Sequence, residues 1–199
     1  MDSQATLLNT VKTSSNATSV VLLTFKVGHQ RYGLPVTNIV RIIEMVTIID
    51  LPHAPEPIQG VINVRGKVVP VMDMRHRFNL ARQAYGLRTP IILIDMAGGQ
   101  HILGLIVDEV DQVLEVEAQN LEIIETFIPA ELTGQMAGQA AYLAGIAKVN
   151  RQMILVLNPH TLLSPSEHNM LSYALNDETQ AAVKNEQQHT LFTGEYVVN

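Results

Sequence analysis

The chain contains two copies of one pattern of glycines and apolar residues. Residues 20–44 align without gaps on residues 91–115, and residues 60–78 align on residues 145–163 at a larger offset. The offset grows because the segment between the two parts is longer in the second copy, where it includes residues 118–144. The aligned pairs include Gly28 with Gly99, Gly33 with Gly104, Leu34 with Leu105, Val36 with Val107, Glu44 with Glu115, Gly60 with Gly145, Val71 with Val156 and Phe78 with Leu163. Such a duplication predicts two similar small domains.

Both copies consist of short β-branched runs broken by Gly, Pro and Asn. Turn signals recur at roughly the 8–12-residue spacing that is typical of an all-β sandwich or barrel. We therefore predict two small β-barrels, the first at about residues 35–90 and the second at about residues 91–165. Because each barrel must close its own edges, we expect strand exchange to blur this boundary. The expected strands include residues 20–27, 32–36, 61–64, 68–74, 90–96, 102–107 and 153–157.

One segment near the end of the chain has strong helix punctuation. Ser164-Pro165-Ser166-Glu167 is a capping box with proline at the first helical position, and apolar residues follow it at helical spacing. We predict a short helix over residues 165–175. The polar residues 1–18 are expected to form a flexible leader, and the Gln-rich residues 176–199 a flexible tail.

Composition excludes several classes of protein. Apolar residues make up 47% of the 199 residues and charged ones 16%, which indicates a globular protein. The net charge of -6 argues against a nucleic-acid binder, and the lack of cysteine excludes disulfides and thiolate zinc sites. No apolar run approaches the ~20 residues that span a bilayer, and no signal peptide is visible. We expect a soluble cytoplasmic protein.

Motifs for catalysis, cofactors or metals are not found. The seven histidines show no HExxH or close His–carboxylate spacing, and Gly98-Gly99-Gln100 is a hairpin turn rather than a phosphate loop. Asp108 and Glu109 are neighbours in an expected strand, so they point to opposite faces and cannot share a substrate. We predict a turn or strand-end role for Asp108. The acidic residues between Glu115 and Glu131 are interpreted as a solvated face.

A hairpin places one arginine at the mouth of an apolar ribbon. Two β-rich runs, residues 60–64 and 68–74, flank Arg65-Gly66-Lys67, where glycine tolerates a positive φ. Two interpretations of Arg65 stay open, a surface corner charge and a residue that orients a partner. The neighbouring Val36, Ile39, Ile42, Val68 and Val69 are mostly expected in cores, and those that face outward would form an apolar binding patch.

The segment from Gly60 to Arg75, GVINVRGKVVPVMDMR, resembles the signature of the CheW-like adaptors of bacterial chemosensory arrays. The resemblance extends over residues 19–175 and includes YGLPV at 32–36, LPHAP at 51–55 and GLIVDEV at 104–110. It implies two five-stranded, SH3-like barrels. It also implies a non-enzymatic scaffold that docks the tip of a methyl-accepting chemoreceptor and the regulatory domain of the histidine kinase CheA. Without receiver or kinase domains, the chain looks like a stand-alone adaptor. The candidate receptor groove comprises Val36, Ile39, Arg41, Ile42, Arg65, Val68 and Val110.

One residue departs from the family's pattern. Family members usually carry glutamate at the position of Arg41, and that glutamate pairs with the arginine equivalent to Arg65. Two facing arginines would repel, so either Glu44 or Asp73 compensates or the receptor surface is retuned, as in a specialised twitching or surface-sensing pathway. A β-barrel that binds a small ligand, or a hydrolase with an unrecognised site, is the alternative function.

Overall fold

The computed structural model describes residues 19–96, 101–123 and 142–176. The predicted leader and nearly all of the predicted tail lie outside these residues, as does most of the 118–144 segment. The strands are β1 (Ser19–Val27), β2 (Gln30–Pro35), β3 (Ile39–Glu44), β4 (Ile58–Val64), β5 (Lys67–Asp73), β6 (Pro90–Asp95), β7 (Ile102–Ile106), β8 (Glu109–Glu117), β9 (Leu121–Ile123), β10 (Leu143–Val149) and β11 (Gln152–Leu157). Short helical turns are η1 (Val36–Asn38), α2 (Met74–Arg77), η2 (Ala118–Asn120) and η4 (Pro159–Thr161), and residues 165–176 form the C-terminal helix.

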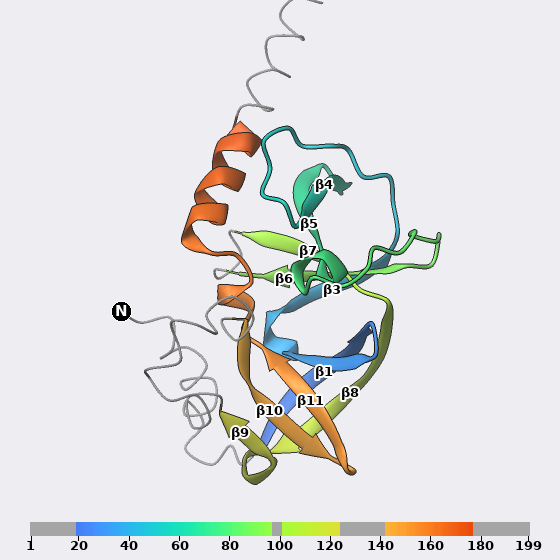
Figure 1. The fold of residues 1–199 in the computed structure, drawn as a ribbon, viewed down its shortest axis with the longest axis vertical. Coiled ribbons are helices and arrows are strands. Elements are labelled where there is room, and N and C mark those ends of the chain that lie inside the picture. The colour runs from blue at the N-terminus through green and yellow to red at the C-terminus, as the bar shows by residue number, and fades with distance from the viewer. Residues whose placement is uncertain (1–18, 97–100, 124–141, 177–199) are drawn as a thin grey trace, which may run out of the picture.

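The strands form two sheets that lie one above the other in Figure 1. The upper sheet, here called barrel 1, has the order β3-β6-β7-β5-β4, and the lower one, barrel 2, has the order β8-β1-β2-β11-β10-β9. The predicted all-β fold with two similar barrels is confirmed. Barrel 2 has six strands rather than five, because the short β9 pairs with β10. Its counterpart in barrel 1 is a single bridge between Ile49 and Val61.

The two barrels have the same topology, and each one borrows strands from the other copy. Strands β1 and β2 of the first copy pair with β8 and β11, whereas the equivalent β6 and β7 of the second copy pair with β3 and β5. The predicted division near residue 90 therefore separates the copies but not the barrels. The hairpins β1–β2 and β6–β7 join their barrels through the same kind of strand pairing. Strand β2 runs parallel to β11, and β7 runs parallel to β5.

Strand β6 is buried on both faces, which explains its unbroken apolar run. In β6, Ile91 and Leu93 belong to the core inside barrel 1, whereas Ile92 and Ile94 belong to a larger core between the barrels. Strands with two buried faces lose the polar alternation of a half-exposed strand. We call this larger cluster the inter-barrel core.

Two equivalent glycines allow the chain to close each barrel tightly. A Cβ at Gly60 would lie 2.2 Å from the carbonyl oxygen of Ile49, and a Cβ at Gly145 would lie 2.5 Å from that of Glu122. Both glycines follow a bulge in their hairpin. The repeated glycine in the sequence thus marks a close backbone approach in each barrel.

The predicted hairpin turn at Arg65-Gly66 is confirmed. Both residues have positive φ, 54° and 82°, as a two-residue type I′ turn requires. The Gly66 N–H donates a hydrogen bond of 2.8 Å to Asn63 Oδ1. The second copy has the same turn at Asn150 and Arg151, with φ of 49° and 64°.

The predicted capping box is also formed. The Ser164 N–H donates to Glu167 Oε2 at 2.8 Å, and the Glu167 N–H donates to Ser164 Oγ at 3.3 Å. The helix then buries Leu171 and Ala174 in the inter-barrel core. This burial fixes the C-terminal helix on the inter-barrel core.

Candidate partner-binding surface

Four of the seven candidate groove residues lie along the junction of the two barrels. Val36, Ile39 and Val110 are half-buried and pack against the inter-barrel core. Ile42 is 42% exposed and pairs with Ile92, whose side chain faces the same core. We call these four residues the seam. Three of them are anchored on this core, and the fourth, Ile42, is open to solvent on the same face of β3 as Ile39.

The other three candidates lie elsewhere. Arg41 pairs with Leu93, which faces the interior of barrel 1, so the register places Arg41 on the face opposite to Ile42. Val68 is 61% exposed on β5, and two strands separate β5 from β3. Arg65 occupies the hairpin tip. The register therefore separates Arg41 and Val68 from Ile42, although all three were expected in one groove.

Neither arginine finds the expected acidic partner. Within the described ranges, Arg41 and Arg65 form no ion pair, and Glu44 forms none either. Asp73 is only 2% exposed and is engaged at the start of α2, so it does not compensate Arg41. Both arginines remain uncompensated cations of barrel 1.

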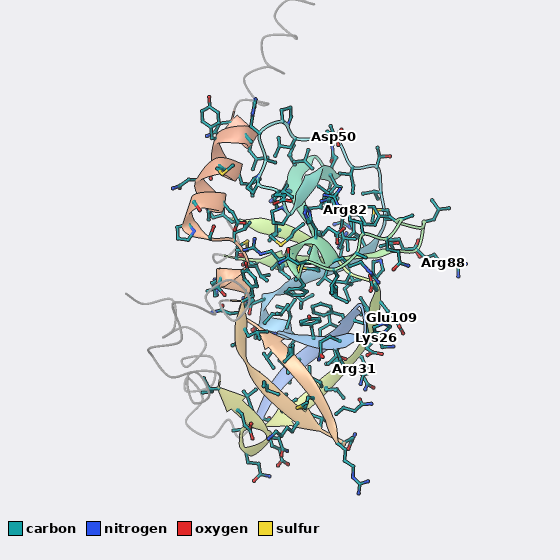
Figure 2. All side chains as sticks on the ribbon, in the orientation of Figure 1. Lys26, Arg31, Asp50, Arg82, Arg88 and Glu109 are labelled. Atoms are coloured by element: carbon teal, nitrogen blue, oxygen red, sulfur yellow. The ribbon has the colours of Figure 1, made fainter. Side chains whose placement is uncertain are left out.

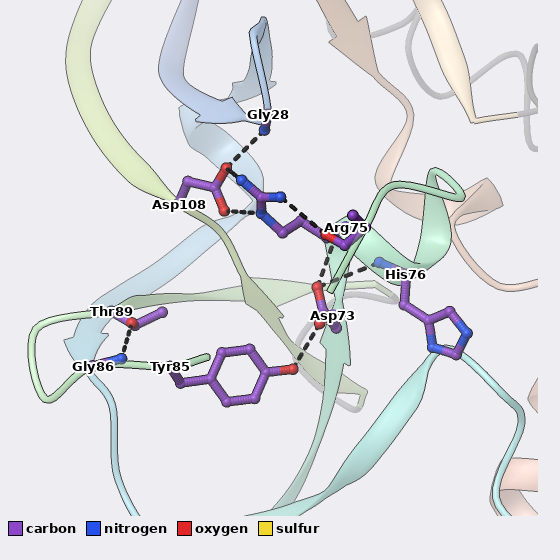
Figure 3. Close-up of polar contacts among 9 residues, drawn as sticks. Gly28, Asp73, Arg75, His76, Tyr85, Gly86, Thr89 and Asp108 are labelled. Atoms are coloured by element: carbon purple, nitrogen blue, oxygen red, sulfur yellow. Dashed lines mark hydrogen bonds and ion pairs between the residues drawn. The ribbon is translucent and has the colours of Figure 1, made fainter. Parts of the chain in front are cut away.

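A salt bridge that sequence reasoning did not identify joins the barrels beside the seam (Figure 3). Arg75, from α2 of barrel 1, donates from Nε and Nη2 to both carboxylate oxygens of Asp108 at 2.7 and 2.8 Å. The same carboxylate accepts the Gly28 N–H at 2.7 Å from the β1–β2 turn. Donation to Asp108 raises the pKa of the Arg75 guanidinium further. We call Gly28, Arg75 and Asp108 the clasp.

Asp73 organises the residues that follow β5. Its Oδ1 accepts the N–H groups of Arg75 and His76 at 2.8 and 3.4 Å, which caps α2. Its Oδ2 accepts the Tyr85 hydroxyl at 2.7 Å (Figure 3). Burial, together with this hydrogen bond, raises the pKa of Tyr85. The expected strand over residues 68–74 includes Asp73, so the sequence did not predict this cap.

Arg77 attaches the C-terminal helix to the barrels. Its guanidinium donates to both carboxylate oxygens of Glu167 at 2.5 and 3.0 Å and lies 4.2 Å from the centroid of the Tyr142 ring. Burial alone would raise the pKa of Glu167, but hydrogen bonds from Arg77 and Ser164 hold it below its usual value. The cap of the helix is thus also its anchor.

The polar groups do not converge on a reactive centre. A hollow of about 530 Å³ is lined by Ser19, Glu115, Glu117, Ala118 and Gln119, where two glutamates accompany one hydroxyl without a histidine. In the described part of the chain, no three His, Asp or Glu side chains are placed to hold a metal ion. Among those same residues, no helix is long and apolar enough to cross a bilayer. The polar side chains instead clamp structural elements together.

Two strand-exchanged barrels with an apolar seam and structural polar clamps define a binding module. Residues 21–167 match the CheW-like domain family, and the chain belongs to this family. It is 28% identical over 145 residues to the chemotaxis protein CheW of Klebsiella aerogenes, covering 73% of this chain and 82% of that one. It is 28% identical over 141 residues to protein FrzA of Myxococcus xanthus, covering 70% and 82%. The crystal structure of the scaffolding protein TtCheW from Thermoanaerobacter tengcongensis superposes with a TM-score of 0.63 at 29% identity, covering 74% and 94%.

Proposed function

We propose that the chain is a non-enzymatic scaffold that couples methyl-accepting chemoreceptors to a CheA-type histidine kinase. The observation that carries this proposal is an anchored apolar seam in a chain whose domain matches the CheW-like family over residues 21–167. We place its action in the cytoplasm, at membrane-associated receptor arrays. A catalyst would need polar groups of perturbed pKa that converge in one pocket. The polar side chains described above instead hold structural elements together.

We infer that the seam is the receptor groove. Receptor tips are helical hairpins, and an apolar helix face would pack on Ile39, Ile42 and Val110. Such grooves bind by burying a few anchor side chains, while surrounding polar residues choose the partner. Val36, at the start of η1, supports this floor from below because it packs on the inter-barrel core.

Binding measurements test both parts of the proposal. A receptor signalling tip and a kinase regulatory domain are titrated against the wild-type chain, and lack of binding to both would refute the scaffold. Ile42→Asp should weaken receptor binding at least about tenfold, because it places an unpaired charge in an apolar contact. Its matched control is Met153→Asp, because Met153 is 64% exposed on β11, a strand that carries none of the seam residues. Equal effects of the two variants would refute the seam as the groove.

The same binding assay tests two further candidate receptor-contact residues, Val68 and Arg41. Val68→Asp should weaken receptor binding only if the groove reaches β5. Arg41→Glu restores the family's usual residue, and it should change which receptor is preferred if the chain serves a specialised pathway. An unchanged preference would agree with the position of Arg41 on the face opposite to Ile42, and it would remove the support for that pathway.

A further inference from the structure

Residues 79–89, here called the arm, connect α2 to β6 and present their largest apolar side chain to solvent. Leu87 is 88% exposed, the highest value of any large hydrophobic side chain in the described residues. Arg82 and Arg88 flank it along the arm, and Arg88 lies at the outer margin of the molecule in Figure 2. Arg82 lies nearer the base of the arm, beside His76, whereas Arg88 directly follows Leu87. An exposed apolar side chain next to an arginine is typical of a contact surface, where arginine and large apolar residues are enriched.

The arm is held in place despite this exposure. Arg75 Nη1 donates to the Ala81 carbonyl at 3.0 Å, and the Tyr85 hydroxyl donates to buried Asp73 at 2.7 Å. The turn at the tip is closed twice, because the Gly86 N–H donates to Thr89 Oγ1 at 2.8 Å and the Thr89 N–H donates to the Gly86 carbonyl at 3.0 Å. A preorganised arm loses little conformational entropy when a partner binds.

Both ends of the arm are tied to strands that carry seam residues. At its start, Ala81 is bonded to Arg75 of the clasp, and Asp108 of the clasp lies two residues before Val110. At its end, the arm leads directly into Pro90, which pairs with Glu44, two residues after Ile42. The arm is therefore connected to the clasp near Val110 at one end and to the end of β3, which carries Ile42, at the other.

The charges of the arm are not neutralised locally. In the part of the chain that the structure describes, Arg88 forms no ion pair, and the only polar contact of the Arg82 side chain is with His76 Nδ1, at 3.4 Å. The two carboxylates at the base of the arm, Asp73 and Asp108, already accept bonds from other groups. A chain of net charge -6 thus carries, next to Leu87, an arginine without an acidic partner among the described residues, whereas Arg82 is joined to Glu56 through His76.

We propose that the arm is a second contact for the receptor tip, beyond the seam, and that it selects helices with acidic residues beside their apolar stripe. This inference rests on the proposed function. Leu87 packs on an apolar residue at the end of the helix face that fills the seam, Arg88 meets a carboxylate beside that residue, and Arg82 meets one nearer the base of the arm. The arginines steer the encounter and choose among receptors, whereas Leu87 slows dissociation.

Surface plasmon resonance with immobilised receptor tip tests the proposal. Arg88→Glu should lower the association rate about 3- to 10-fold at low salt, with the difference shrinking at high salt, because exposed charges act through a screened field. Arg88→Lys keeps the charge and should associate like the wild type. Arg151→Glu is the matched control. Arg151 is an exposed arginine in the β10–β11 turn of barrel 2, remote from the arm. Leu87→Ser should raise the dissociation rate about tenfold.

The outcomes separate this inference from the proposed function. A wild-type chain that binds no receptor tip refutes the scaffold and the arm together. A wild-type chain that binds, with Arg88→Glu and Leu87→Ser unchanged, refutes the arm alone. Weakened binding to the kinase regulatory domain, with receptor binding unchanged, also refutes the proposal by assigning the arm to the kinase. Equal losses for Arg88→Glu and Arg151→Glu would show a general charge effect instead.

Discussion

Alanine substitutions at three glycines distinguish the free-energy cost of a strained backbone conformation from the cost of a steric clash. Gly66 has a φ of +82° and nothing within 4 Å of an added Cβ. At Gly145 φ is not positive, but an added Cβ would lie 2.5 Å from the Glu122 carbonyl oxygen. Gly60 combines a φ of +141° with a Cβ position 2.2 Å from the Ile49 carbonyl oxygen. Alanine substitution therefore measures backbone strain at Gly66, a steric clash at Gly145 and both effects together at Gly60.

The expected losses of unfolding free energy follow from these contacts. A positive φ costs alanine about 1–2 kcal/mol, and restricting the unfolded chain returns about 0.4–1 kcal/mol. Gly66→Ala should thus cost about 1 kcal/mol. Forcing a carbon against a backbone carbonyl costs about 3 kcal/mol, the upper end for overpacking, so Gly145→Ala should cost about 2 kcal/mol. Gly60→Ala should cost about 4 kcal/mol, because its strained conformation adds to the clash.

Urea unfolding followed by circular dichroism measures these differences. With a slope of about 2 kcal/mol/M, the midpoint should fall by about 0.5 M for Gly66→Ala, 1 M for Gly145→Ala and 2 M for Gly60→Ala. A midpoint for Gly60→Ala no lower than that of Gly66→Ala would refute the reasoning, because the approach of Ile49 would then carry no cost.

Two predictions concern the polar clamps. Asp108→Asn should cost about 1–3 kcal/mol, because it breaks a part-buried bidentate bond of the clasp. Glu109→Gln, which breaks an exposed pair with Lys26, should leave the unfolding free energy nearly unchanged. Equal midpoints in urea would contradict a structural role for the clasp. The Arg77 guanidinium and Ser164 hold the folded-state pKa of Glu167 below its usual value. Its stabilising effect is therefore present above the unfolded pKa and lost as the pH falls through the folded pKa. In Glu167→Gln the unfolding free energy should fall less steeply towards acid pH than in the wild type. An unchanged fall would contradict a stabilising role of the Arg77–Glu167 pair.

Local sequence patterns predicted the strands, turns and helix of the fold better than they predicted which strands pair with one another. The β-branched runs, the type I′ hairpin and the capping box all depend on residues close together in the chain, and all three are present. The assignment of β6 and β7 to the second barrel was wrong, because pairing between β6 and β3 depends on contacts that no local pattern encodes. Matching glycines revealed the duplication but not which copy completes which barrel.

The surface was predicted only in part, for similar reasons. The seam residues were found through a family resemblance, whereas Arg41 was expected beside them. A β-bulge between Ile39 and Arg41 reverses the alternation, so Ile39 and Ile42 share a face and Arg41 takes the other. The clasp was missed because its members are far apart in sequence, 33 residues between Arg75 and Asp108 and 80 between Gly28 and Asp108. Asp108 does have the predicted strand-end role, with a partner that spacing did not reveal.

The strand exchange makes this single chain equivalent to a domain-swapped dimer whose two subunits have been fused. A fragment that ends near residue 85 would carry β3, β4 and β5 without β6 and β7, and it would expose β1 and β2 without β8 and β11. Such a fragment has no complete barrel, but two copies of it could complete each other by the same exchange. Cutting the chain in the arm should therefore yield halves that recombine rather than two independent folding units.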